Sequence, residues 1–211
     1  MRALIITGGE CAKRMTVPGH DMCIAADSGL LRAAEIGVFP HYIIGDFDSL
    51  GTVPTEYTDP DTGRKSEIIR HPTQKNETDT MLAAEFAIER GATELFIIGG
   101  LGGRADHTLS NVFLLEALSD RGVHVIYTDG ANELRVMVEG ESAQIPHGEY
   151  KYFSTLALDE CVISVMGCAY PLDCSTLTRA NAYAVSNETL PCGATVTCHK
   201  GKLLIVRSER I

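Results

Sequence analysis

Acidic residues follow two apolar runs of this 211-residue chain, at the points where strands would end. Asp27 follows Met22–Ala26, and Asp46 with Asp48 follows Tyr42–Ile44. The carboxyl ends of parallel strands meet at one edge of a sheet, where open α/β sheets bind ligands. Two carboxylates about 5 Å apart repel by roughly 3 kcal/mol at an effective dielectric of about 20, so a cluster of them requires cations or protons. We therefore predict a site for a hard cation, Mg²⁺, at this edge.

A glycine-rich segment follows a third apolar run, Leu95–Ile98. Gly99-Gly100-Leu101-Gly102-Gly103 contains more glycines than a tight turn needs. Such a segment at the start of a helix lets a phosphate approach backbone N–H groups. Asp106 lies just beyond it and Asp79 opens another predicted helix, so both carboxylates are expected near the same edge. Mg²⁺ beside a glycine-lined loop indicates a substrate that carries phosphate.

These side chains require a framework, and residues 1–129 supply one by alternating strand and helix patterns. Apolar runs without alternation predict parallel strands buried on both faces, and capped helical patterns separate them. Residues 51–66 are polar and are predicted to form a long surface loop. The predicted strands are Ala3–Ile6, Met22–Ala26, Tyr42–Ile44, Leu95–Ile98 and Val123–Tyr127; the predicted helices are Ser28–Ile36, Thr78–Arg90 and Asp106–Arg121, the last with Leu109, Phe113 and Ala117 on one i+4 row.

After about residue 130 the pattern changes to short runs with partial alternation, separated by turn signals. No convincing helix follows, which predicts a small β-sandwich or barrel. The fold class is therefore an α/β N-terminal domain with a mainly parallel, Rossmann-like sheet (1–129), followed by a small all-β sandwich domain (130–211). The predicted late strands are Glu133–Val138, Ser142–Ile145, Tyr150–Leu156, Cys161–Val165, Ala182–Val185, Ala194–Cys198 and Leu203–Val206.

Composition excludes several classes of protein. The chain has 28 acidic and 18 basic residues, a net charge of −10, which argues against nucleic acid as a partner. Its apolar runs are too short to span a bilayer, so no membrane association is expected. The seven cysteines contain no Cys-x-x-Cys pair. We interpret them as small buried hydrophobes in a reducing cytoplasm.

Two other interpretations of the motifs remain open. Gly100-x-Gly102-x-x-Ala105 matches a dinucleotide fingerprint, with Asp129 placed to bind a ribose, which would indicate an NAD-dependent oxidoreductase. Against it, the motif follows a late strand, and Asp106 at the helix start would oppose a bare pyrophosphate. The first acidic pair also fits a phosphatase nucleophile and acid, but Leu50 stands where that scheme expects Thr or Val.

Taken together and in order, six segments resemble the thiamine pyrophosphokinase family, and they run through nearly the whole chain. Three of them carry the predicted acids and glycines, and three lie in the late all-β part. They are Gly45-Asp46-Phe47-Asp48-Ser49, Lys75-Asn76-Glu77-Thr78-Asp79, Gly99-Gly100-Leu101-Gly102-Gly103-Arg104-Ala105-Asp106-His107, Gly167-x-x-Tyr170-Pro171-Leu172, Val185-Ser186-Asn187-Glu188 and Gly201-Lys202-Leu203-Leu204.

The resemblance implies an enzyme that transfers a pyrophosphoryl group from ATP to the hydroxyl of thiamine, giving thiamine diphosphate and AMP. It implies a nucleotide-binding catalytic domain followed by a thiamine-binding domain, in a homodimer whose subunits share the site. A catalytically inactive thiamine-binding sensor on the same fold is the remaining alternative.

The resemblance also implies a role for each matching residue. The implied enzyme depends on Mg²⁺, ATP and thiamine. The chain departs from the family at two points: Asn76 replaces an Asp that the family often has, and the chain has no Trp to stack on thiamine. By resemblance, Asp46, Asp48 and Asp79 hold Mg²⁺ with Asp27 near them; Gln74, Thr78, Gly102, Gly103, Arg104 and His107 surround the ATP phosphates; Asp106 receives the thiamine hydroxyl; and Ser186 and Asn187 contact thiamine.

Overall fold

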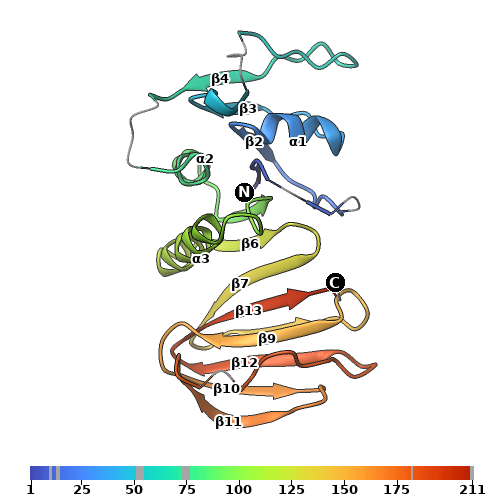
Figure 1. The fold of residues 1–211 in the computed structure, drawn as a ribbon, viewed down its shortest axis with the longest axis vertical. Coiled ribbons are helices and arrows are strands. Elements are labelled where there is room, and N and C mark those ends of the chain that lie inside the picture. Colours follow the sequence, from blue (N-terminus) through green and yellow to red (C-terminus); the bar gives the residue numbers. More distant parts are fainter. Residues whose placement is uncertain (10, 13–14, 51–54, 73–76, 182, 210–211) are drawn as a thin grey trace. The chain divides into compact units, whose positions relative to one another are not determined.

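The computed structural model describes residues 1–9, 11–12, 15–50, 55–72, 77–181 and 183–209. The chain divides into two compact units, Met1–Gly130 and Ala131–Ile211. The first unit contains parallel strands and helices, and the second contains antiparallel strands (Figure 1). None of the described helices of the chain is both long enough and apolar enough to cross a bilayer.

Six strands of the first unit pair in the order β4-β3-β2-β1-β5-β6, and every described pairing among them is parallel. Five of these strands confirm the predictions from apolar runs. The sixth, β4, was missed because it is a short edge strand whose side chains are only half-buried or exposed. The strands are β1 (Arg2–Ile6), β2 (Met22–Ala26), β3 (Tyr42–Gly45), β4 (Glu67–Arg70), β5 (Glu94–Ile98) and β6 (His124–Thr128).

Three α-helices connect these strands: α1 (Gly29–Glu35), α2 (Asp79–Glu89) and α3 (Ala105–Asp120). Because parallel crossovers are right-handed, a helix that leads toward β4 and one that leads toward β6 lie on opposite faces of the sheet. Figure 1 shows this arrangement, with α1 on one side and α2 and α3 on the other. The three predicted helices are confirmed to within two residues at each end.

The buried face of α3 is not the apolar i+4 row, Leu109, Phe113 and Ala117, from which the helix was predicted. Leu109 and Phe113 are exposed, whereas Asn111, Leu115 and Leu118 are buried. The helical period predicts that two faces differ but does not say which of them packs on the sheet. The row at 109, 113 and 117 is therefore an apolar surface of this chain.

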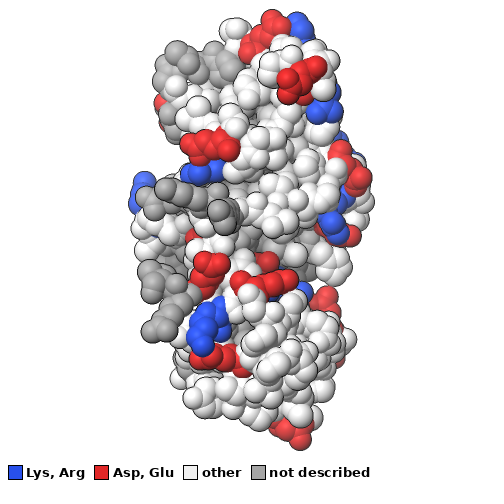
Figure 2. Space-filling view, turned by 90° about the vertical axis from the view of Figure 1, so that its right-hand side faces the viewer, with Lys and Arg blue, Asp and Glu red and all other residues white. Residues whose placement is uncertain are grey.

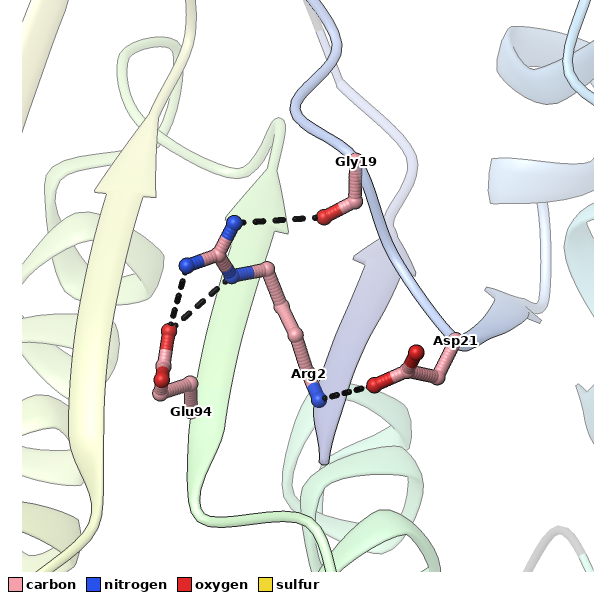
Figure 3. A network of polar contacts seen from close by, with 4 residues as sticks. All are labelled: Arg2, Gly19, Asp21 and Glu94. Carbon is pink, nitrogen blue, oxygen red and sulfur yellow. Dashed lines mark hydrogen bonds and ion pairs between the residues drawn. The ribbon is translucent and has the colours of Figure 1, made fainter.

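The amino end of β1 is held by a polar network, drawn in Figure 3. The Arg2 guanidinium donates to Glu94 Oε2 from Nε at 3.0 Å and from Nη2 at 2.6 Å, and its Nη1 donates to the Gly19 carbonyl at 3.3 Å. The Arg2 amide donates to Asp21 Oδ2 at 2.8 Å. These contacts join β1 to β5 and to the segment before β2. They therefore support the register of the central strands at their amino ends, opposite the carboxyl ends where the acidic residues lie.

The second unit contains seven antiparallel strands in two groups, β7-β13-β9 and β11-β10-β12-β8. Apolar residues from both groups, such as Met137 and Ile163, form one core. The strands are β7 (Asn132–Val138), β8 (Ser142–Ile145), β9 (Tyr152–Ala157), β10 (Cys161–Met166), β11 (Leu172–Leu177), β12 (Ala194–Lys200) and β13 (Lys202–Ser208).

Two predictions in this unit differ from the structure. Residues 183–185 form no strand, and residue 182 lies outside the described residues. β11 was missed because its side chains are mostly exposed or half-buried, which removes the apolar signal. The expected burial of the cysteines is confirmed for Cys23, Cys161, Cys168 and Cys198, whereas Cys11 is half-buried and Cys174 and Cys192 are exposed.

Candidate active site

The strand order of the first unit changes direction between β1 and β5, because the chain passes from β1 outward to β4 and then returns to β5. Open α/β sheets bind ligands at such a switch point, outside the carboxyl ends of the strands. The segments after β1 and β5 pack closely there: a Cβ on Gly9 would lie 3.2 Å from the Gly100 amide nitrogen, and a Cβ on Gly99 would lie 2.8 Å from the Thr7 carbonyl oxygen. Glycine at these positions therefore lets the segments after β1 and β5 approach each other.

Asp27 stands at the end of β2, next to the end of β3. Its amide donates to the Ile44 carbonyl at 2.8 Å, which continues the parallel ladder by one residue. A Cβ on Gly45 would lie 3.1 Å from both the Cα and the Cβ of Asp27, so glycine lets the two strand ends approach. Asp27 is buried and has a left-handed backbone, with φ 48°. Such a conformation in a non-glycine residue is strained and is common at functional sites.

Phe47, the residue between Asp46 and Asp48, places both carboxylates on the same side of the segment. Phe47 is 2% exposed and packs with Ala25, Leu30 and Ile43. The segment is not extended, because Phe47 has φ 65° and a 3-10 turn begins at Asp48. The Asp48 amide donates to Asp46 Oδ1 at 3.2 Å. Anchoring of the phenyl ring in the core thus turns both flanking carboxylates to the sheet edge.

Asp27, Asp46 and Asp48 form one acidic group, in which a carboxylate oxygen from each lies within 4.8 Å of the others. Asp27 Oδ1 is buried and has no hydrogen-bond partner among the described residues. An unsatisfied buried carboxylate oxygen is costly and calls for a ligand. Three hard oxygen donors with one unsatisfied atom fit a divalent cation such as Mg²⁺.

Asp79 lies outside this group of three in the described structure. It is the first residue of α2, where its carboxylate also interacts favourably with the helix dipole. The preceding residue, Thr78, is the N-cap and its side chain accepts a hydrogen bond from the Met81 amide at 3.2 Å. Gln74 falls outside the described residues. The assignment of Asp79 to the metal and of Thr78 and Gln74 to ATP therefore stays a prediction.

The glycine-rich loop adopts a backbone that other residues rarely accept. Gly99, Gly100, Gly102 and Gly103 all have positive φ, between 64° and 94°. Such a run requires glycine, so it identifies a specialised loop instead of a simple turn. The loop leads directly into α3, and the Gly102 amide donates to Thr108 Oγ1 at 3.1 Å. Backbone N–H groups at this helix start can bind an anion.

Arg104 and Asp106 form a bidentate ion pair at the start of α3. Arg104 donates from Nε to Asp106 Oδ1 at 3.1 Å and from Nη2 to Oδ2 at 2.6 Å, and both side chains are exposed. The His107 amide donates to Asp106 Oδ1 at 3.0 Å. The Arg104 hydrogen bonds hold the pKa of the Asp106 carboxyl below its usual value. Asp106 is therefore ionised at neutral pH, and both charges of the pair stand at the solvent.

Basic side chains form no broad patch on the described part of the face in Figure 2, where blue groups are few and lie among red ones. A polyanionic substrate would then be bound by local contacts instead of by general basic charge. The ion pair of Arg104 and the cation that three acids would recruit are local contacts of this kind.

The two late candidates, Ser186 and Asn187, lie in the second unit. Ser186 has φ 55°, and its amide donates to Ser154 Oγ at 3.0 Å. Asn187 is buried; its Nδ2 donates to the Tyr170 carbonyl at 2.8 Å and its Oδ1 accepts from the Tyr170 amide at 3.1 Å. The side chain of Asn187 is thus used to hold the backbone of Tyr170.

Three further residues were not singled out by the sequence. Tyr170, held by Asn187, is 71% exposed although it is aromatic, and its place in the Gly167-x-x-Tyr170-Pro171-Leu172 segment was the available signal. Asn111 and Tyr127 lie buried under the glycine-rich loop. No local pattern marks them, because a polar residue on a helix and a Tyr in a strand are ordinary.

Comparison with known proteins connects this geometry to one family. A family model for the catalytic domain of thiamin pyrophosphokinase matches residues 15–127. A thiamine pyrophosphokinase of Bacillus subtilis is 28% identical over 192 residues, covering 90% of this chain and 88% of the relative. The solved structure of a thiamine pyrophosphokinase from B. subtilis matches with a TM-score of 0.82 at 25% identity and full coverage of both chains. That of a thiamin pyrophosphokinase from Geobacillus thermodenitrificans matches with a TM-score of 0.80 at 27% identity, covering 100% of this chain and 98% of that one.

Proposed function

Because the chain belongs to the thiamin pyrophosphokinase family and is a thiamine diphosphokinase, we propose that it transfers the β,γ-pyrophosphoryl group of ATP to the hydroxyl of thiamine and releases AMP. The observation that carries this proposal is the acidic group Asp27, Asp46 and Asp48 with its unsatisfied buried oxygen. The group lies at the same sheet edge as a glycine-rich loop that leads into a helix.

The acidic group fits Mg²⁺, with Asp46, Asp48 and the unsatisfied oxygen of Asp27 as ligands and Asp79 at the start of α2 as a further one. When bound, Mg²⁺ would neutralise phosphate charge, which is the main requirement of phosphoryl transfer. The chain's own part is to hold several carboxylates close together before the substrate arrives. Positioning of this kind lowers the entropic cost of the reaction.

The phosphates of ATP would lie along the glycine-rich loop. A Cβ on Gly102 or on Gly103 would have no atom within 4 Å, so the backbone there is open to a phosphate. Arg104 offers a planar fork that matches phosphate oxygens. His107 follows on the first turn of α3, and Thr78 and Gln74 are assigned to the same phosphates by family likeness. In this arrangement Arg104 would exchange its bond to Asp106 for one to phosphate.

Asp106 would then receive the hydroxyl of thiamine. Its carboxylate is ionised and exposed and lies within reach of Arg104, which would bind the phosphates, so a hydroxyl that donates a hydrogen bond to it would lie near the reacting phosphorus. We assign Asp106 the role of orienting this hydroxyl and accepting its proton.

Thiamine itself would be recognised by the second unit. Tyr170 offers an exposed aromatic ring, and aromatic faces bind cations such as the thiazolium of thiamine. Asn187 fixes the backbone of Tyr170, and Ser186 precedes Asn187 in the chain. Asn187 would therefore act on thiamine by holding Tyr170 in place. The proposed division is a nucleotide-binding catalytic part at 1–129 and a thiamine-binding part at 130–211.

We propose further that the protein is a homodimer in which each site includes the second unit of the partner subunit. The exposed apolar row on α3, with Leu109 at 55% and Phe113 at 64% exposure, supports this proposal because large apolar side chains on one helix face favour burial against another chain. Light scattering coupled to size exclusion measures the mass; a monomer at micromolar concentration would contradict it.

We place the protein in the cytoplasm. All seven cysteines are free thiols, which is typical of a reducing compartment. Burial raises the pKa of the Cys198 thiol to about 11, so this group stays neutral and unreactive at physiological pH.

The activity is tested by incubating the purified protein with ATP, MgCl₂ and thiamine. We expect AMP and thiamine diphosphate in equal amounts, and no product when MgCl₂ is replaced by a chelator. Release of ADP with thiamine monophosphate would contradict pyrophosphoryl transfer. Binding of thiamine with no product at all would favour the inactive sensor.

The ion pair of Arg104 and Asp106 predicts a pH effect. In the protein without ATP, Arg104 lowers the pKa of Asp106, so the carboxylate remains ionised until the pH falls through that lowered value. Arg104→Gln should raise the pKa of Asp106 toward its usual value in the ATP-free protein. An NMR titration of the Asp106 carboxyl carbon measures the shift directly. An unchanged pKa in the variant would show that the pair does not form in solution.

A further inference from the structure

Three buried polar side chains from different elements converge under the glycine-rich loop. Thr7 follows β1, Tyr127 lies in β6 and Asn111 lies in α3. A Cβ built on Gly100 would lie 2.7 Å from the Tyr127 hydroxyl, 2.9 Å from Asn111 Nδ2 and 3.3 Å from Thr7 Oγ1. These side chains therefore form a polar floor, directly beneath Gly100.

Of these three described side chains, only Asn111 makes a hydrogen bond to the backbone of residues 100–103 in the glycine-rich loop. Asn111 Nδ2 donates to the Gly100 carbonyl at 2.8 Å. The Thr7 hydroxyl is directed at the carbonyls of Ile98 and Gly8, at 3.0 and 3.2 Å. The Tyr127 hydroxyl makes no hydrogen bond to the backbone of the loop. Asn111 thus orients the loop, whereas Tyr127 only lies against it.

The orientation has a direct consequence for the next peptide group. In a trans peptide the carbonyl of one residue and the N–H of the following residue point in opposite directions. Because Asn111 holds the Gly100 carbonyl toward the buried floor, the Leu101 N–H points away from it. Gly100 has φ 70°, so the loop reaches this orientation only with glycine.

We propose that Asn111 is a positioning residue for the phosphate chain of the nucleotide: by fixing the Gly100 carbonyl, it presents the Leu101 N–H to a phosphate oxygen. This inference rests on the proposed function, in which the loop receives the phosphates of ATP. Asn111 is buried and touches no substrate, so its effect is on nucleotide binding and not on the chemical step.

The test compares Asn111→Leu, which keeps the shape and removes the donor, with Tyr127→Phe, which removes a hydroxyl of the same floor that makes no bond to the loop. KM is measured for MgATP and for thiamine, and calorimetry gives the Kd of an inert ATP analogue without thiamine. For Asn111→Leu we expect the KM of MgATP and the Kd of the analogue to rise about tenfold, and the KM of thiamine to change less than about twofold. Tyr127→Phe should leave all three within about twofold.

Asn111→Asp is a second variant, which keeps a polar side chain but, when ionised, has no donor for the carbonyl. Measured at a pH where its carboxyl is ionised, it should weaken analogue binding as Asn111→Leu does. The proposal is overturned if either Asn111 variant binds the analogue as tightly as the wild type, if both KM values rise equally, or if Tyr127→Phe has the same effect. If the wild type binds the analogue but makes no thiamine diphosphate, the proposed function fails, and the Kd comparison still decides on Asn111. A wild type that binds no analogue overturns both.

Discussion

Asp46→Asn is expected to reduce the rate of thiamine diphosphate formation by about 10²–10³-fold, because losing one ligand removes several kcal/mol of metal-dependent charge stabilisation. Asp46 lies between the other two members of the acidic group in the chain, and its carboxylate oxygen is within 4.8 Å of theirs. Asparagine keeps the size and one acceptor oxygen, so the change tests charge and not packing.

The same substitution should have the opposite effect on the metal-free protein. Three carboxylates at this separation repel one another, so removing one charge should raise the midpoint of thermal unfolding in the presence of a chelator. MgCl₂ should raise the midpoint of thermal unfolding of the wild type above its value in the chelator, because a ligand that binds only the folded state stabilises that state. The variant should gain less from MgCl₂.

Asp173→Asn is the matched control, since Asp173 is an exposed carboxylate on β11 in the other unit. It should change neither the rate nor the response to MgCl₂. Should Asp46→Asn keep a rate within about threefold of the wild type, or gain as much stability from MgCl₂, the acidic group would not be the metal site.

Gly29→Ala is expected to destabilise the fold severely. A Cβ on Gly29 would lie 1.9 Å from the carbonyl oxygen of Ile6 and 2.6 Å from its carbonyl carbon. Both atoms belong to the end of the central strand β1, and the following amide, Thr7 N–H, donates to the Ile98 carbonyl at 2.8 Å. Because backbone on both sides is held, the clash cannot be relieved by turning a side chain.

We expect a loss of about 3 kcal/mol or more in the free energy of unfolding, which lowers the midpoint of thermal unfolding by about 6–12 °C in a chain of this size. The acidic group should suffer as well, since α1 begins two residues after Asp27 and displacing the helix displaces the carboxylate. Circular dichroism during heating measures the midpoint.

Gly19→Ala is the control for this prediction. A Cβ on Gly19 would have no atom within 4 Å, and its φ is not in the left-handed region, so alanine should cost less than about 0.5 kcal/mol there. Equal midpoints for the two variants would mean that α1 does not pack against β1 as closely as the structure has it.

The extent to which the fold was predictable depended on burial. β1, β2, β3, β5 and β6 were found from the sequence because both faces of each are covered, which leaves continuous apolar runs. β4 and β11 were missed because partly exposed edge strands carry no such run. The row at Leu109 and Phe113 marked α3 correctly but indicated nothing about its packed face.

For the candidate site, residue types and spacing sufficed to predict a chemistry: carboxylates after buried strands, glycines before a helix, and an Arg with an Asp at that helix start. These are local properties, because strand ends, helix starts and positive φ are encoded within a few residues. They were enough to predict a phosphate-handling, Mg²⁺-dependent site and the order of the elements that carry it.

The assembly of the acidic group was decided in three dimensions. Asp27 and Asp46 are far apart in the chain, and they meet because β2 and β3 pair in parallel register and Gly45 lets their ends approach. The inward turn of Phe47 and the bond from Asn111 to Gly100 likewise depend on partners from other elements. No spacing along the chain encodes such contacts, because the distance between two side chains is set by the packing of the elements that carry them.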